Sequence, residues 1–325
     1  MQELFKIENY SLFLNSDGKR QNVITSANLK VGRGEVVGLI GESGSGKSML
    51  WKSLLGLADT VLWTSTGSFK FDGRVIECGN EKDLAPLRGK EIAVIMQDTM
   101  SSFDQLFTIE EHFIETARIH TNWTRKETIK KAIDLLLSLN IRSPEKVLKM
   151  YPFQCSGGML QRIMIAIALM LNPSMIIADE PTTSVDVTAQ REIIALLKQV
   201  KEKFGTGILF ISHDMKAVEN LADRVYVMYA GYLVESFDGE DFKEGKVFHP
   251  YTQKLLQSRP SYTRDYLPVL KGNPPALSER QAGCPFAPRC PESIDECRIF
   301  DMSQVVTTQG HRICCIRWET QNENT

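Results

Sequence analysis

The sequence has no long apolar run and almost no net charge. Its longest uninterrupted hydrophobic stretch covers residues 163–171, well short of the roughly 20 residues that a helix needs to cross a bilayer. Lys and Arg number 38 and Asp and Glu number 40, which gives a net charge of −2. This balance excludes a general electrostatic attraction to nucleic acid or anionic lipid. We therefore expect a chain that does not span a membrane and carries no dedicated nucleic-acid-binding module.

The amino terminus and the cysteines exclude two further classes. Residues 1–6 lack the basic segment and following apolar segment of a secretory signal peptide. Seven cysteines are an odd number, and five of them follow residue 283, which favours thiols or metal ligands over a disulfide framework. We expect a protein of the cytosol. A length of 325 residues predicts roughly two domains.

Short apolar runs alternate with segments of helical period, which predicts an α/β fold with a mostly parallel sheet covered on its faces. A segment without such runs, residues 98–160, is rich in helix formers and predicts a helical insert. Proline-rich sequence after about residue 246 predicts an irregular appended domain. The predicted strands are residues 36–40, 92–96, 175–178, 207–211 and 224–228, and the predicted helices include 48–57, 125–139 and 187–204.

Residues 41–48 match the phosphate-binding pattern G-x4-G-K-[ST], between a predicted strand and a predicted helix. In this motif the glycines let backbone N–H groups surround the phosphates, and the helix N-terminus adds a positive dipole. Lys47 is expected to reach the β- and γ-phosphates of ATP, and Ser48 to bind Mg²⁺. The candidate nucleotide-binding residues of the loop are Ser43, Gly44, Ser45, Gly46, Lys47 and Ser48.

Two adjacent carboxylates, Asp179 and Glu180, follow the predicted strand 175–178. Ligands of open α/β sheets bind at the carboxyl ends of the strands. We expect Asp179 to belong to the Mg²⁺ shell and Glu180 to orient the attacking water, because metal binding and water activation require separate acceptors.

The phosphate loop is followed by further short motifs in a fixed order and spacing. Residues 155–162 read C-S-G-G-M-L-Q-R and precede an apolar helix. The full set resembles the ATP-binding cassette (ABC) ATPases over about residues 1–240. It consists of the loop, Gln97, Ser156-Gly157-Gly158, Asp179-Glu180, Ser184-Val185-Asp186 and His213.

The resemblance implies a RecA-like sheet with a β subdomain and a helical subdomain in a nucleotide-binding domain of residues 1–245. It further implies that Ser156, Gly157 and Gly158 cap the ATP held by the loop of a second cassette, so that the working unit is a dimer. A Gly-Gly turn at a helix N-terminus is physically suited to bind an anion.

The same resemblance implies roles for individual residues. Gln97 would link the Mg²⁺ site to the helical insert, Asp186 would lie in the loop that joins two cassettes, and His213 would contact the γ-phosphate. Phe13 is the candidate for stacking on adenine. Cys155 stands where the family generally has Leu.

Other motifs resemble the branch of dipeptide, oligopeptide and nickel importer ATPases. They include Tyr151-Pro152, residues 178–183 and the sequence His-Pro-Tyr-Thr at 249–252, followed by Cys-Pro pairs. Residues 146–153 and 159–162, with His112 and residues 115–116, resemble the nickel subunits, whereas the long C-terminal domain 246–325 resembles the peptide subunits. The sequence therefore leaves three candidates for the transported solute: a peptide, nickel and a metal chelate.

The branch implies an ATPase subunit on the cytoplasmic face of the membrane. Its implied partners are a second, paralogous ABC ATPase subunit, two transmembrane permease subunits and an extracytoplasmic solute-binding protein. In this family the permease docks on the helical insert. Apolar residues such as Phe103, Leu106 and Phe107 either contribute to that surface or belong to the core.

Four cysteines in the C-terminal domain, Cys284, Cys290, Cys297 and Cys315, are separated by five, six and seventeen residues. This spacing is looser than that of usual zinc ligand pairs, and Cys-Pro occurs beside cluster-bound thiolates. The resemblance to peptide importer ATPases implies a [4Fe–4S] cluster on these positions, with Cys314 as the substitute for Cys315. A zinc site and the absence of any metal are the two alternatives that the sequence leaves.

The alternative function is that of a soluble ABC ATPase of DNA repair or chromosome maintenance. Such proteins carry long coiled coils or DNA-binding inserts, and the sequence contains neither a sustained heptad pattern nor a basic block. We therefore expect an ATPase that uses ATP and Mg²⁺ to power import, with no nucleic acid partner.

Overall fold

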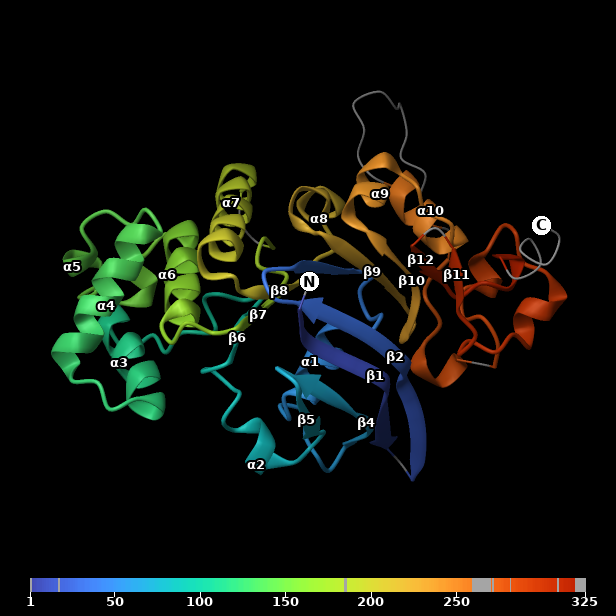
Figure 1. Ribbon diagram of the computed structural model, residues 1–325, viewed down its shortest axis with the longest axis horizontal. Coiled ribbons are helices and arrows are strands. Elements are labelled where there is room, and N and C mark those ends of the chain that lie inside the picture. The colour runs from blue at the N-terminus through green and yellow to red at the C-terminus, as the bar shows by residue number, and fades with distance from the viewer. Residues whose placement is uncertain are drawn as a thin grey trace. The chain divides into compact units, whose positions relative to one another are not determined.

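The computed structural model describes residues 2–16, 18–183, 186–258, 270, 272–280, 282–308 and 310–318. The chain forms two compact units (Figure 1). The first unit contains Gly32–Glu35 and Lys82–Phe210, and the second contains Glu3–Val31, Val36–Glu81 and Ile211–Thr325. Among the described residues, no helix combines the length and the apolar character needed to cross a bilayer.

The sheet of the first unit has the strand order β8-β7-β6. Its strands are β6 (Ile92–Ile95), β7 (Met175–Asp179) and β8 (Gly207–Ile211), of which β8 contributes its first four residues. β6 runs parallel to β7, with Ile92 opposite Met175. Every residue of β7 and β8 is buried, as expected for parallel strands covered on both faces.

Much of the remainder of the first unit is helical. Thr108 and Thr124 each form a complete capping box with the glutamate three residues later, which fixes the starts of α3 and α4. Helices α3, α4 and α6 pack on one another (Figure 1, green). The helical elements are α3 (Ile109–His120), α4 (Arg125–Ser138), α5 (Pro144–Val147), η1 (Pro152–Gln154), α6 (Gly157–Leu169) and α7 (Val187–Phe204). Short α2 (Glu81–Leu84) begins at the boundary of this unit.

The second unit contains two sheets. One is antiparallel with the order β2-β1-β4-β5, and Phe5 of β1 lies opposite Phe71 of β4. The other has the order β11-β12-β10-β9-β3. The strands of the first sheet are β1 (Glu3–Ser16), β2 (Lys19–Gly32), β4 (Trp63–Phe71) and β5 (Arg74–Glu77). Those of the second are β3 (Val36–Ile40), β9 (Arg224–Tyr229), β10 (Tyr232–Asp238), β11 (Val306–Thr308) and β12 (His311–Ile313).

The expectation of a mostly parallel arrangement is correct for only part of the second unit. β3 and β9 are parallel, whereas β10, β11 and β12 add to β9 as antiparallel strands. The last two come from the C-terminal part of the chain, where the sequence predicted only irregular structure. The helices of this unit are α1 (Lys47–Leu54), α8 (Met215–Leu221), α9 (Gly239–Glu244), α10 (Pro250–Gln257), and the short η2 (Leu277–Glu279), η3 (Ala287–Arg289) and η4 (Asp295–Arg298).

Candidate functional site

The phosphate loop connects β3 to α1 within the second unit. The backbone of Gly41 has φ 153°, and a Cβ at this position would lie 2.1 Å from the carbonyl oxygen of Met228. Gly46, the N-cap of α1, has φ 109°. Both positions therefore require glycine, because a side chain would clash at the first and strain the backbone at the second. Ser43 and Gly44 are exposed between them.

Lys47 is the first residue of α1, and its side chain is buried against the loop. Its ammonium group donates to the carbonyl oxygens of Gly41 at 2.8 Å and Glu42 at 2.9 Å, and to Ser45 Oγ at 3.4 Å. Ser48 follows in the first turn of the helix. The loop thus holds a cation beside a helix N-terminus, which is an arrangement suited to polyphosphate.

The carboxylates lie in the first unit, at the end of β7. Asp179 is buried, and Glu180 has a left-handed backbone with φ 48°. The Glu180 carboxylate accepts hydrogen bonds from Gln97 Nε2 at 3.2 Å and from Thr183 Oγ1 at 2.9 Å, both at Oε2. The structure therefore brings Gln97 and Glu180 together. Thr183 was not among the residues predicted from the sequence.

Ser156 and Asp186 are helix N-caps in the same unit. The Ser156 hydroxyl accepts from the backbone N–H of Met159 at 3.3 Å, and Gly157 and Gly158 form the first turn of α6. Asp186 Oδ1 accepts from the N–H groups of Thr188 and Ala189, both at 2.9 Å, and begins α7. Ser184 and Val185 lie outside the described residues.

His213 belongs to the second unit and is exposed directly after β8. The neighbouring Asp214 caps α8 and donates its backbone N–H to Ser212 Oγ at 2.9 Å. The helix cap formed by Asp214 and its hydrogen bond to Ser212 thus fix the turn that contains the histidine.

Comparison with known proteins identifies the family. The model of the ABC transporter family matches residues 24–183, and that of the oligopeptide/dipeptide transporter C-terminal region matches residues 219–297. The chain is 37% identical to the oligopeptide transport ATP-binding protein AppD of Bacillus subtilis (strain 168), covering 99% of this chain and 98% of the relative. It is 35% identical to the dipeptide transport ATP-binding protein DppD of Escherichia coli (strain K12), with 96% of each chain covered. The chain belongs to the ATP-binding proteins of the oligopeptide and dipeptide ABC transporter family.

Solved structures agree with this fold. The ATP-binding cassette MJ0796, solved as a dimer in a post-hydrolysis state bound to ADP and Pi, aligns with a TM-score of 0.63 at 24% identity, covering 72% of this chain and 98% of that chain. CbiO1 from Clostridium perfringens aligns with a TM-score of 0.64 at 22% identity, covering 76% and 92%. The predicted α/β fold of an ABC ATPase is confirmed, and the chain is an ABC-type ATPase.

The candidate adenine-stacking residue of this ABC ATPase has a cation over its ring. The Arg20 guanidinium lies 3.7 Å from the centroid of the Phe13 ring, within the sheet that contains β1 and β2. One face of this aromatic ring is therefore covered by a guanidinium group. The role of Phe13 stays a prediction.

The four C-terminal cysteines of this ABC ATPase are not joined in disulfide bonds in the described part of the chain. All four cysteines belong to the part of the chain that the structure describes. Within that part, no group of three His, Cys, Asp or Glu side chains is arranged to hold a metal ion. Burial raises the pKa of Cys284 to about 12 and that of Cys315 to about 11. The [4Fe–4S] cluster expected on these four cysteines therefore stays a prediction.

The apolar residues of the helical insert divide between core and surface. Phe103 is 6% exposed and its ring packs edge-on against His112, with centroids 4.9 Å apart. Leu106 is 82% exposed and Phe107 is 41% exposed. Of the two readings left open by the sequence, core therefore applies to Phe103 and surface to the other two.

Proposed function

We propose that this ABC ATPase powers the import of peptides through a membrane transporter. The observation that carries the proposal is the similarity to AppD and DppD over nearly the whole chain, including the C-terminal region matched by the oligopeptide/dipeptide family model. Peptides are favoured over nickel and metal chelates because these relatives are named for oligopeptide and dipeptide transport. The full-length match to transporter subunits also disfavours the alternative of a soluble DNA-repair ATPase.

The roles proposed for the site residues follow from their chemistry. The ammonium group of Lys47 and the N–H groups of the loop would bind the phosphates of ATP. Glu180, oriented by Gln97 and Thr183, would accept a proton from the attacking water. His213 would contact the γ-phosphate. Ser156, Gly157 and Gly158 would cap the ATP held by a second cassette, and Asp186 would lie in the loop that joins the two cassettes.

The oxygen donors of the predicted ligands suit Mg²⁺, which prefers oxygen ligands. Ser48, Asp179 and Gln97 would hold the ion. When bound, Mg²⁺ neutralises charge on the phosphates. We assign Asp179 to the ion, because Glu180 is the residue proposed to act on water.

The partners we propose are two permease subunits, a solute-binding protein and a paralogous ATPase, with this chain on the cytoplasmic face. A pocket of about 380 Å³ in the first unit supports permease docking; its lining includes Met96, Phe103, Ile119 and Met164. Ile119 is 70% exposed at this pocket. Ile119→Asp should lower transport while leaving ATP binding by the isolated chain unchanged.

We also propose that Cys284, Cys290, Cys297 and Cys315 bind a metal centre, with [4Fe–4S] ahead of zinc. The thiolate donor set suits either. The backbone N–H of Cys284 donates to the carbonyl of Cys297 at 2.7 Å, which holds two of the four segments together. Iron and sulfide in anaerobically purified protein would support the cluster; one zinc per chain without iron, or no metal, would exclude it.

The proposed function is tested by uptake in cells with and without this subunit, with labelled dipeptide, nickel and a nickel chelate supplied in parallel. Loss of dipeptide uptake alone is the expected result, and loss of metal uptake alone would contradict it. In the assembled transporter, Lys47→Ala should abolish tight ATP binding. Glu180→Gln should keep ATP binding and reduce turnover at least about 100-fold, because the water loses its proton acceptor.

A further inference from the structure

Glu42, the second residue of the phosphate loop, is held by two residues from the C-terminal part of the second unit. Its carboxylate accepts hydrogen bonds from Arg289 Nη1 at 2.7 Å and from Arg289 Nη2 at 3.0 Å. Its backbone N–H donates to the Tyr251 hydroxyl at 2.9 Å. Both the side chain and the backbone of Glu42 are therefore anchored outside the loop.

The Glu42–Arg289 pair is largely shielded from water. The side chain of Arg289 is 6% exposed and that of Glu42 is 23% exposed. Arg289 Nη1 also donates to the Tyr229 hydroxyl at 3.1 Å. The Tyr229 ring packs on those of Tyr251 and Phe286, with centroids 4.6 and 5.3 Å apart. A bidentate pair in such surroundings is strong and fixes geometry, unlike an exposed ion pair.

Glu42 also connects this anchor to the lysine of the loop. Its carbonyl oxygen accepts from Lys47 Nζ at 2.9 Å, so the same residue bonds Arg289 by its side chain, Tyr251 by its N–H and Lys47 by its C=O. A displacement of Glu42 would carry this carbonyl with it. The position of the Lys47 ammonium group is therefore coupled to Arg289, which is 247 residues away from Glu42 in the sequence.

The motif His-Pro-Tyr-Thr at residues 249–252 has a structural reason in this arrangement. His249 Nδ1 accepts from the backbone N–H of Tyr251 at 3.1 Å and caps α10, with Pro250 at its first position. This start of the helix places the Tyr251 hydroxyl against the loop.

We propose that Tyr251 of α10 and Arg289 of the cysteine-rich segment, residues 270–318 as described, are positioning residues for ATP binding that hold the phosphate loop in its nucleotide-binding conformation. The proposal rests on the role proposed above for residues 41–48. It predicts that weakening the anchor lowers the affinity for nucleotide, whereas the hydrolytic step, which depends on Glu180 in the other unit, changes little.

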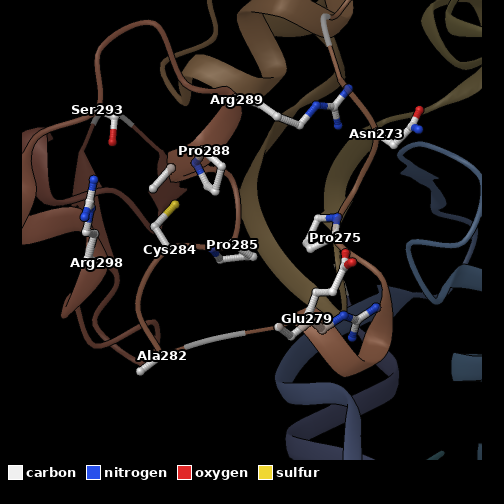
Figure 2. A pocket seen from close by; sticks show the side chains of 12 residues that line it. Asn273, Pro275, Glu279, Ala282, Cys284, Pro285, Pro288, Arg289, Ser293 and Arg298 are labelled. Atoms are coloured by element: carbon white, nitrogen blue, oxygen red, sulfur yellow. The ribbon is translucent and has the colours of Figure 1, made fainter.

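A second, half-buried arginine of the same segment, Arg280, provides a matched control. Arg280 and Arg289 both line a pocket of about 450 Å³. Figure 2 shows Arg289 and Cys284 at this pocket. The Arg280 guanidinium donates from Nη1 to the carbonyl oxygens of Val23 at 2.9 Å and Asn22 at 3.2 Å. Its replacement thus disturbs the same pocket through bonds that do not involve the loop.

The experiment measures the KM for ATP and kcat in the assembled transporter, and ADP affinity of the isolated full-length chain by calorimetry. Arg289→Gln and Glu42→Gln should each raise KM about tenfold, as expected for loss of a coupled charged pair, with kcat within about twofold. The double variant should match either single variant, because both break one interaction. Arg289→Lys should recover part of the affinity, Tyr251→Phe should raise KM about threefold, and Arg280→Gln should leave it unchanged.

The proposal is overturned if Arg289→Gln leaves KM within about twofold, if the two single effects multiply in the double variant, or if Arg280→Gln has an equal effect. A fall in kcat with unchanged KM would also overturn it. Glu42→Gln, which keeps the shape of the side chain, carries the test alone if Arg289 variants do not assemble. Lys47→Ala tests the proposed function of the loop separately from the proposed role of its anchor. Unaltered ATP binding in that variant would refute the assignment of residues 41–48 as the nucleotide-binding loop.

Discussion

The helical insert of the first unit and the cysteine-rich segment of the second, residues 270–318 as described, are stabilised by different kinds of interaction. In the insert, α3 and α4 begin with capping boxes formed by residues three positions apart. In the cysteine-rich segment, the described helices are turns of three or four residues. Its bonds instead reach far along the chain, as from Arg289 to Glu42 and from Trp318 Nε1 to the carbonyl of Phe248.

The two regions therefore depend to different degrees on the rest of the protein for their stability. Local bonds cost little loop-closure entropy, so an element built from them forms from its own sequence. Contacts between distant residues are gained only once the surrounding structure exists. Substitutions in the insert should therefore destabilise only nearby structure. Substitutions in the cysteine-rich segment should also destabilise parts of the protein that are distant in sequence.

The largest effect is expected at Gly283 in the cysteine-rich segment. Its backbone has φ 88°, and an added Cβ would lie 2.3 Å from the carbonyl oxygen of Arg298. Gly283→Ala should destabilise the protein by about 3 kcal/mol or more, because a backbone atom must move. Thermal unfolding and hydrogen exchange of the Cys284 amide measure the loss.

Gly310→Ala is the control for this prediction. Gly310 has φ 83° with nothing within 4 Å of an added Cβ, so only backbone strain of about 1 kcal/mol is expected. Equal losses in the two variants would show that the close contact with Arg298 is unimportant.

The next effect is the pH dependence contributed by His249. Burial lowers the pKa of this histidine from 6.5 to about 4, and nearby Glu235 opposes the shift only partly. Because the folded-state pKa lies below the unfolded value, the stabilisation is complete above about pH 6.5 and is lost as pH falls toward 4. The loss should be about 3 kcal/mol, because each unit of pKa shift corresponds to about 1.4 kcal/mol. Denaturant unfolding between pH 4 and 8 measures it.

His249→Asn keeps an acceptor at the N-cap of α10 but cannot titrate in this range. Its stability should therefore vary less between pH 4 and 6.5 than that of the unsubstituted protein. Parallel curves for the two proteins would rule out His249 as the source.

The smallest effect is expected in the insert, from Thr124→Ala. This change removes the hydroxyl that accepts from the backbone N–H of Glu127 at 3.3 Å, and should cost about 1 kcal/mol. Faster hydrogen exchange should be confined to the first turns of α4. Thr116→Ala, which removes a mid-helix hydroxyl from α3, should cost less than about 0.5 kcal/mol. Loss of protection in the cysteine-rich segment of the second unit would contradict the local character of the insert.

The parts predicted from sequence are those whose determinants are local. The buried strands at 36–40 and 207–211 and the helix at 187–204 have the predicted bounds, since unbroken apolar runs and helical periodicity are visible in one window. The exposed antiparallel strands, such as β4 (Trp63–Phe71), were missed because Ser, Thr and Gly interrupt their alternation. The helix predicted at 48–57 ends earlier, at Leu54, because Gly56 adopts φ 65° soon after.

The parts of the site that could not be predicted depend on distant partners. The sequence shows Arg289 only as a charge between Pro288 and Cys290, with no signal that it is buried against Glu42. Similarly, Thr183 contacts the Glu180 carboxylate because of the turn after β7, which no periodicity reveals. Phe103 and Leu106 lie three residues apart in one loop, and only tertiary packing separates the buried residue from the exposed one.

The left-handed backbone conformation of Glu180 has a consequence for stability. At φ 48° a glycine or asparagine would fit with less strain, so replacement should raise thermal stability by about 1 kcal/mol while removing the carboxylate that Gln97 and Thr183 orient. By the role proposed for Glu180, such a variant would be more stable and would lose turnover. Glutamate at this position thus combines a strained backbone with the carboxylate that the proposed hydrolysis needs.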